Sequence, residues 1–223
     1  MPNITPECIP PKHMEKAEEI RAYLVSVRGG AYFLSGADGL LLVQWLDQGH
    51  PVPAILCAID RVAARRRAKR TRARMSLGAC KGELRKVLGG KDRRRSPKTH
   101  KGGYSGWLGR LCAMEIPEGI RGARLRMVDR LAALEGTECR EEAARKGATA
   151  CREFHQEVWE ASMEEHESLQ QQAEAELESM ASLLPPSRWR EAVEEIMRDK
   201  LRSRYPLVSA QAVWEALNQG EER

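Results

Sequence analysis

The residues best suited to chemistry in this sequence are arginines, which gather in one short stretch. The segment RVAARRRAKRTRAR, residues 61–74, holds eight Arg or Lys in fourteen positions and no acid. Cations all round a helix repel one another unless an anion lies near, and Arg suits bidentate phosphate contacts. Each phosphate that meets a cation releases counterions, so such a segment binds nucleic acid in a salt-dependent way. The predicted contact residues are Arg61, Arg65, Arg66, Arg67, Lys69, Arg70, Arg72 and Arg74.

A second basic stretch follows at residues 89–103, GGKDRRRSPKTHKGG, which is rich in Gly and charge and has no apolar anchor. This composition predicts a linker that adds Arg93, Arg94 and Arg95 to the nucleic-acid-binding set. Tyr104 and Trp107 lie just beyond it and are able to stack on unpaired bases. DNA rather than RNA is the expected partner. Two other readings stay open: the arginines pair with the acidic back of the same chain, or with an acidic protein partner.

Histidine and cysteine offer a weaker signal. Cys151 and His155 are four positions apart on a predicted helix, with Cys139 and His166 as the other ligand types nearby. Structural zinc needs four ligands in tight pairs, and the second pair is missing here. The sequence also contains none of the motifs GxSxG, HExxH or GxxxxGK[ST]. We therefore expect no catalytic residues, no metal and no cofactor, and hence a protein that is not an enzyme.

The distribution of charge divides the chain into two parts. Residues 61–110 hold 18 Lys or Arg against 2 acids, a net charge of +16. Residues 138–199 hold 16 acids against 7 basic residues, a net charge of −9. Such asymmetry is typical of a polyanion-binding part joined to an interaction part, although the two halves could also simply attract each other.

The composition favours an all-α fold, a compact N-terminal helical bundle followed by long amphipathic helices. Ala and Leu dominate the apolar residues, and only two Phe are present. The N-terminus has no apolar signal segment, and no apolar run approaches the length of a membrane span. The six cysteines include no CxxC pair. We expect a cytoplasmic protein with reduced, mostly buried thiols and no membrane partner.

The front half is expected to form four helices. The first spans about residues 12–27 and ends at the glycines of RGG. Ser35 is the expected cap of a second helix, and Gly49 is its expected C-terminal stop. A third helix follows the prolines of HPVP and continues into the arginines. A short fourth helix is expected to follow, with Ser76 as its cap.

The back half is expected to be helical up to its end. Helices are predicted at about 104–117 and 121–134, and residues 138–183 form either one long helix or two, with a bend at the polar MEEHES. PPS at 185–187 starts another helix, and Ser209 caps the last. An apolar stripe along the long segment is the expected site of self-association or of a protein partner. Its residues are Phe154, Val158, Leu169, Leu177, Met180 and Leu184.

These elements predict four regions. Residues 1–11 are an irregular lead-in, residues 12–90 a basic helical bundle and residues 91–103 the basic linker. Residues 104–223 are a helical back part that is acidic from about residue 138.

The stretch LLLVQWLDQGHPVPAILCAIDRVAARRRAKRTRARMSLGACKGELRKVL, residues 40–88, resembles the C-terminal domain of DnaD-type replication initiation proteins. The resemblance rests on Trp45, Gly49, Ile55, Ala58 and Ile59. It implies an all-helical DNA-binding domain that helps to recruit the replicative helicase and its loader. The family's last helix carries Tyr, Ile and Trp at four-residue steps, whereas this chain has Cys80, Leu84 and Leu88 there. DNA contacts are therefore expected from the arginines instead.

The expected function is that of a non-enzymatic nucleic-acid-binding protein, an accessory factor in DNA replication or a related DNA process. The alternative is a helical interaction or assembly protein whose arginine tract meets an acidic partner.

Overall fold

The computed structural model describes residues 9–30, 34–69, 75–89, 103–178 and 185–218, without the side chains of residues 69, 186 and 187. Helices and no strands occur in these ranges, which confirms the expected all-α class. Three 3-10 turns, η2 (Pro11–His13), η3 (Glu118–Ile120) and η4 (Met163–Glu165), accompany the α-helices. The α-helices in chain order are α1 (Met14–Arg28), α2 (Gly36–Asp47), α3 (Val52–Lys69), α4 (Leu77–Leu88), α5 (Gly103–Cys112), α6 (Arg121–Ala132), α7 (Arg140–Ala161), α8 (His166–Leu177), α9 (Pro186–Ser203) and α10 (Ala210–Asn218).

Local sequence determines where several helices begin and end. The Ser35 hydroxyl accepts a hydrogen bond from the Asp38 amide at 3.2 Å, which confirms Ser35 as the cap of α2. Gly49 has a φ of 72° directly after α2, the left-handed conformation that glycine adopts without strain. Ser209 also caps α10 as expected, because its hydroxyl accepts from the Ala212 amide at 3.1 Å.

Helix α3 lies at the centre of the front half. Every residue from Val52 to Asp60 is buried, and α3 packs against α4 on one side and α1 on another. The apolar faces of α1, α2 and α4 complete this core with residues such as Leu24, Trp45 and Leu77. The buried first half of α3 therefore fixes the direction in which its arginine-rich second half projects.

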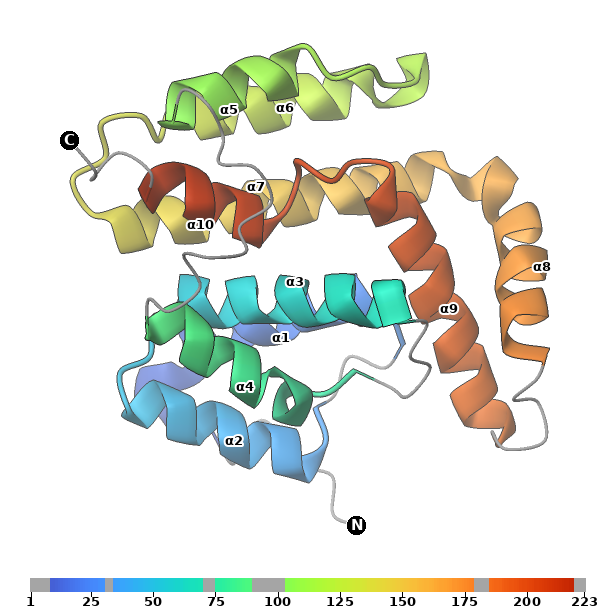
Figure 1. Ribbon diagram of the computed structural model, residues 1–223, viewed down its shortest axis with the longest axis horizontal. Coiled ribbons are helices and arrows are strands. Elements are labelled where there is room, and N and C mark those ends of the chain that lie inside the picture. The colour runs from blue at the N-terminus through green and yellow to red at the C-terminus, as the bar shows by residue number, and fades with distance from the viewer. Residues whose placement is uncertain (1–8, 31–33, 70–74, 90–102, 179–184, 219–223) are drawn as a thin grey trace.

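Helix α7 has the corresponding place in the back half. Helices α6 and α10 pack against it, and α5 covers both of these, so that α7 and α10 lie between the α5–α6 pair and the front helices (Figure 1). Gly147 allows α7 and α10 to approach closely: a Cβ at this position would lie 2.7 Å from Val213 Cγ1.

The long acidic segment forms two helices and not one. It turns at Ser162, whose hydroxyl donates a hydrogen bond to the Val158 carbonyl at 2.7 Å, and the η4 turn that follows lies within the polar MEEHES where the sequence predicts a bend. Helix α8 then packs against α9, and Figure 1 shows this hairpin at one end of the molecule, running across the direction of α7.

The helices on the two sides of residues 90–102 pack against each other. Helix α3 contacts α10 and α7, and α1 contacts α9. Ala148 of α7 and Ala210 of α10 belong to the front apolar cluster. The boundaries of the four predicted regions stay a prediction, but the basic and acidic parts of the chain meet directly.

Candidate nucleic-acid interface

The arginine segment begins in the second half of α3, where Ala and Arg both favour a helix. Arg61, Arg65, Arg66 and Arg67 are described there, and Lys69 ends the helix without a described side chain. The other predicted contact residues lie outside the described residues: Arg70, Arg72, Arg74, Arg93, Arg94 and Arg95.

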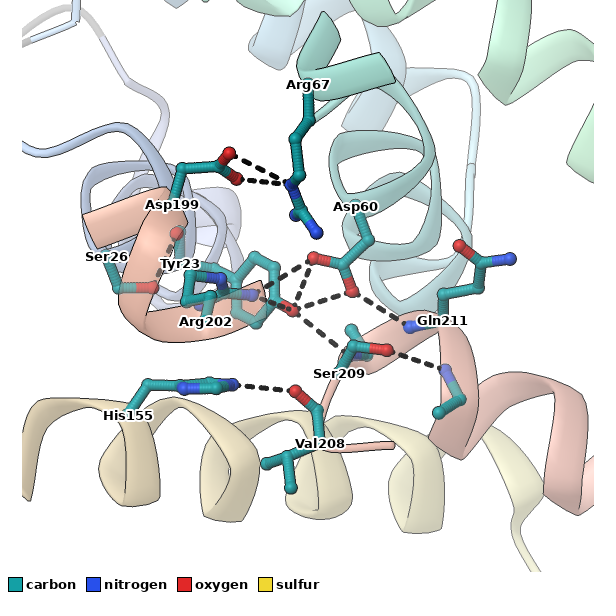
Figure 2. A network of polar contacts seen from close by, with 12 residues as sticks. Tyr23, Ser26, Asp60, Arg67, His155, Asp199, Arg202, Val208, Ser209 and Gln211 are labelled. Atoms are coloured by element: carbon teal, nitrogen blue, oxygen red, sulfur yellow. Dashed lines mark hydrogen bonds and ion pairs between the residues drawn. The ribbon is translucent and has the colours of Figure 1, made fainter. Parts of the chain in front are cut away.

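Three of the four described arginines face carboxylates of the C-terminal helices. These ion pairs join Arg61 to Glu215 at 3.4 Å, Arg66 to Glu195 at 3.4 Å, and Arg67 to Asp199 at 2.8 Å. Figure 2 shows the Arg67 guanidinium directed at both oxygens of Asp199. The reading in which the basic tract pairs with the acidic back therefore holds for these three side chains. Their guanidinium groups are occupied by carboxylates in this arrangement, although the Arg67 side chain is still 40% exposed.

The carboxylates of two of these pairs are partly buried between the helices. Burial raises the pKa of Glu195, and the charge of Arg66 only partly opposes this effect. Burial likewise raises the pKa of Asp199 against the pull of Arg67. The loss of hydration thus outweighs the attraction of the guanidinium groups at both carboxylates.

Arg65 lies on a different side of α3 and points to α4. It is 2.5 Å from Glu83, which also accepts a hydrogen bond from Lys86 at 2.9 Å. The Glu83 side chain is only 8% exposed, whereas those of Arg65 and Lys86 are 46% and 53% exposed. One buried carboxylate thus holds two exposed cations.

Two further cations lie on the outer side of α4. Lys81 and Arg85 are exposed, stand one helical turn apart, and form no ion pair with a described residue. We call Arg65, Lys81, Arg85 and Lys86 the α4 basic face. Glu83, the one acid within α4, is buried, so the exposed charged side chains of this helix are all positive.

A buried polar network, which the sequence did not predict, joins the front and back helices. The Tyr23 hydroxyl donates to Asp60 at 2.8 Å, and Arg202 lies 3.3 Å from the same carboxylate (Figure 2). The amides of Ala210 and Gln211 donate to Tyr23 and Asp60. The signal in the sequence is an acid, Asp60, at the end of the otherwise apolar first half of α3. Tyr23 of α1 and Asp60 of α3 are buried and bond to each other and to groups of α9 and α10, so the network joins these four helices.

The candidate metal ligands do not converge. His155 Nε2 lies 2.7 Å from the Val208 carbonyl, and Cys151 is fully buried. Cys139 is exposed before α7, and the His166 ring packs at a tilt against Trp159. Within the described ranges, no three His, Cys, Asp or Glu residues are grouped so as to hold a metal ion.

The buried cysteines have no sign of reactivity. Burial raises the pKa of the Cys57 thiol to about 12, and that of Cys80 also to about 12. A thiol with such a pKa stays protonated near neutral pH and packs as a small apolar group.

The apolar stripe predicted to bind a partner is covered by the chain itself, which corrects that expectation. Phe154 and Val158 are 1% and 2% exposed, and Leu169 and Leu177 are 3% and 0% exposed. These four belong to the core formed with α6, α9 and α10. The helical periodicity was right, but the covering surface came from the same chain. Met180 and Leu184 lie outside the described residues.

Comparison with protein-family models, with curated proteins and with solved structures found no match for this chain. The resemblance to the C-terminal domain of DnaD-type proteins thus stays a prediction. Among the described helices, none is long and apolar enough to cross a membrane.

Proposed function

We propose that this chain is a non-enzymatic nucleic-acid-binding protein that contacts phosphate through the α4 basic face. The observation that carries the proposal is that Lys81 and Arg85 are exposed and form no ion pair with a described residue, on the helix whose Lys86 shares Glu83 with Arg65. A helix of this length is about 18 Å long, enough to follow several phosphates of a nucleic-acid strand.

The sequence on both sides of α4 supports the same proposal. Arg70, Arg72 and Arg74 lie in the segment that leads into α4, and Arg93, Arg94 and Arg95 follow its C-terminal end. The α4 basic face connects these two basic segments along the chain. Contacts that depend on many cations and few base edges give salt-dependent binding with little sequence preference.

DNA replication or a related DNA process is the proposed setting, and DNA the proposed nucleic acid. This part rests on the resemblance of residues 40–88 alone. Four of the five residues that carry the resemblance, Trp45, Ile55, Ala58 and Ile59, are buried packing residues. They determine how the helices pack, and whether the protein acts in DNA replication has to be tested by experiment.

A second candidate function is assembly with an acidic protein partner. The observation that favours it is that Arg61, Arg66 and Arg67 already pair with carboxylates of their own chain. An assembly protein should form oligomers or a complex that persist at about 200 mM salt, where nucleic-acid binding through phosphate weakens steeply.

Fluorescence anisotropy with labelled DNA and RNA, single- and double-stranded, tests the proposed function. Salt is varied from about 50 to 200 mM, and the wild type should lose orders of magnitude in affinity. The variant K81Q/R85Q removes two exposed cations and leaves Glu83 with both of its partners. It should bind more weakly, with a salt dependence shallower by about two.

The variant K16Q/R190Q is the matched control, because it removes one Lys and one Arg from exposed positions on α1 and α9. It should bind as the wild type does, apart from the small effect of net charge. Absence of wild-type binding at about 50 mM salt would refute the proposal. Equal losses in both variants would place the binding surface elsewhere.

A further inference from the structure

A hollow separates the second half of α3 from the α8–α9 hairpin. Its volume is about 270 Å³, and Val27, Met75 and Ile196 are among the apolar residues that line it. Arg66 and Arg67 enter it from α3, and Glu195 and Asp199 enter it from α9. The two helices are therefore joined at this place by long charged side chains across a space that apolar packing does not fill.

The two carboxylates resemble neighbouring phosphates in how they meet the arginines. Glu195 and Asp199 stand one turn apart on α9. Their partners Arg66 and Arg67 are consecutive residues of α3. The Asp199 carboxylate lies within 2.9 Å of Arg67 Nε through both of its oxygens, an arrangement that a phosphate can also adopt. Burial raises the pKa of both carboxyls, because their charged forms lose hydration between the helices.

The α8–α9 hairpin has other contacts that hold it to the molecule. Leu169, Ala173 and Leu177 of α8 pack with the apolar side of α9, and α9 also packs against α1 and α7. Arg202 of α9 takes part in the buried network around Asp60. Release of the Glu195 and Asp199 pairs would consequently leave the hairpin attached.

We propose that Arg66 and Arg67 form a second phosphate-binding site, which Glu195 and Asp199 occupy when no nucleic acid is bound. Nucleic-acid phosphates and the α9 carboxylates then compete for the same two guanidinium groups. The α4 basic face makes the first contact, and the α3 arginines add to it only when α9 releases them. This inference rests on the proposed function and adds its regulation.

The variant E195Q/D199N tests the competition, because it keeps the shape of both side chains and removes their charge. If α9 leaves the arginines free for about one-tenth of the time, its neutralisation raises DNA affinity about tenfold. The control E160Q/E164Q changes the net charge equally at exposed positions of α7 and η4.

Adding R66Q/R67Q separates competition from a general effect of charge. In the E195Q/D199N background these substitutions should abolish the gain, and they should cost about tenfold more affinity there than in the wild type, where α9 already competes for the two arginines. A gain no larger than that of E160Q/E164Q, with the wild type binding DNA, overturns the competition and leaves the proposed function intact. No binding by any variant overturns both.

Hydrogen exchange of the wild type provides a test that does not depend on any variant folding correctly. Amides of α9 around residues 192–203 should exchange faster when a DNA duplex is bound, because their side chains have lost partners on α3. Unchanged or slower exchange in this segment of a saturated complex would contradict the proposal.

Discussion

At the scale of single residues, Gly147 shows how closely two helices approach. Gly147→Ala places a methyl group 2.7 Å from Val213 Cγ1 and 3.4 Å from Leu131 Cδ2. Overpacking of this kind costs about 1–3 kcal/mol, and the better helix propensity of Ala returns about 1 kcal/mol. Urea unfolding should show a net loss of about 1 kcal/mol. Gly82→Ala in α4, where nothing lies within 4 Å of the new Cβ, should instead stabilise the protein. Equal effects of the two substitutions would argue against the tight α7–α10 contact.

His155 should make stability depend on pH. Burial, with a smaller contribution from the charge of Arg202, lowers its pKa well below the ordinary 6.5. The unfolded chain then binds more protons than the folded chain below pH 6.5, so the free energy of unfolding falls as the pH falls. The loss from this residue approaches about 1.4 kcal/mol per pH unit.

Urea unfolding of the wild type and of H155Q between about pH 7.5 and 5.5 measures this effect. The carboxyls whose pKa is raised by burial, Asp60, Glu195 and Asp199, act in the opposite direction. They are present in both proteins and cancel in the comparison. Parallel pH profiles of the two proteins would show that His155 is not held neutral.

At the scale of helices, the two serine caps of the front half differ. The Ser35 hydroxyl accepts from the Asp38 amide, whereas Ser76 precedes α4 without a side-chain cap hydrogen bond. Ser35→Ala should therefore lower the free energy of unfolding by about 1 kcal/mol, and Ser76→Ala by much less. Thermal unfolding of both variants under identical conditions provides the comparison. A larger loss from Ser76→Ala would reverse this assignment.

Helix positions were largely predictable because their causes are local. The cap at Ser35, the left-handed Gly49 and the polar stretch that follows Ser162 each act within a few residues of the chain. The partner of an apolar stripe is not local. Phe154 and Leu177 had the correct helical spacing, but only the folded chain shows that its own helices cover them.

At the scale of the whole molecule, the charge of the arginine tract is a local property of the sequence, whereas the partners of its arginines are not. The tract is plain in the sequence, but Arg67 meets Asp199 across 132 positions and Arg61 meets Glu215 across 154. Charge asymmetry predicted that the halves attract, but it did not show which arginines pair. Arg65 and Arg66 are adjacent in the sequence, and they face different helices with different acids.

The network around Asp60 should couple the front and back halves in stability. Asp60→Asn leaves the Arg202 guanidinium buried without its counter-charge, and Arg202→Met does the same to Asp60. Each single substitution should cost about 3–5 kcal/mol in urea unfolding. The double variant D60N/R202M leaves neither charge unpaired, so it should cost about 1–3 kcal/mol less than the sum of the two.

The network should also determine whether the front and back halves unfold together. The network joins α1 and α3 of the front half to α9 and α10 of the back half, and each half also has its own apolar core. With the network intact, one transition should be seen by all probes. In the single variants, hydrogen exchange should resolve the halves, with α9 and α10 opening before α3, because the link is lost while the cores remain. Additive losses and a single transition in every variant would show that the halves are held together by other contacts.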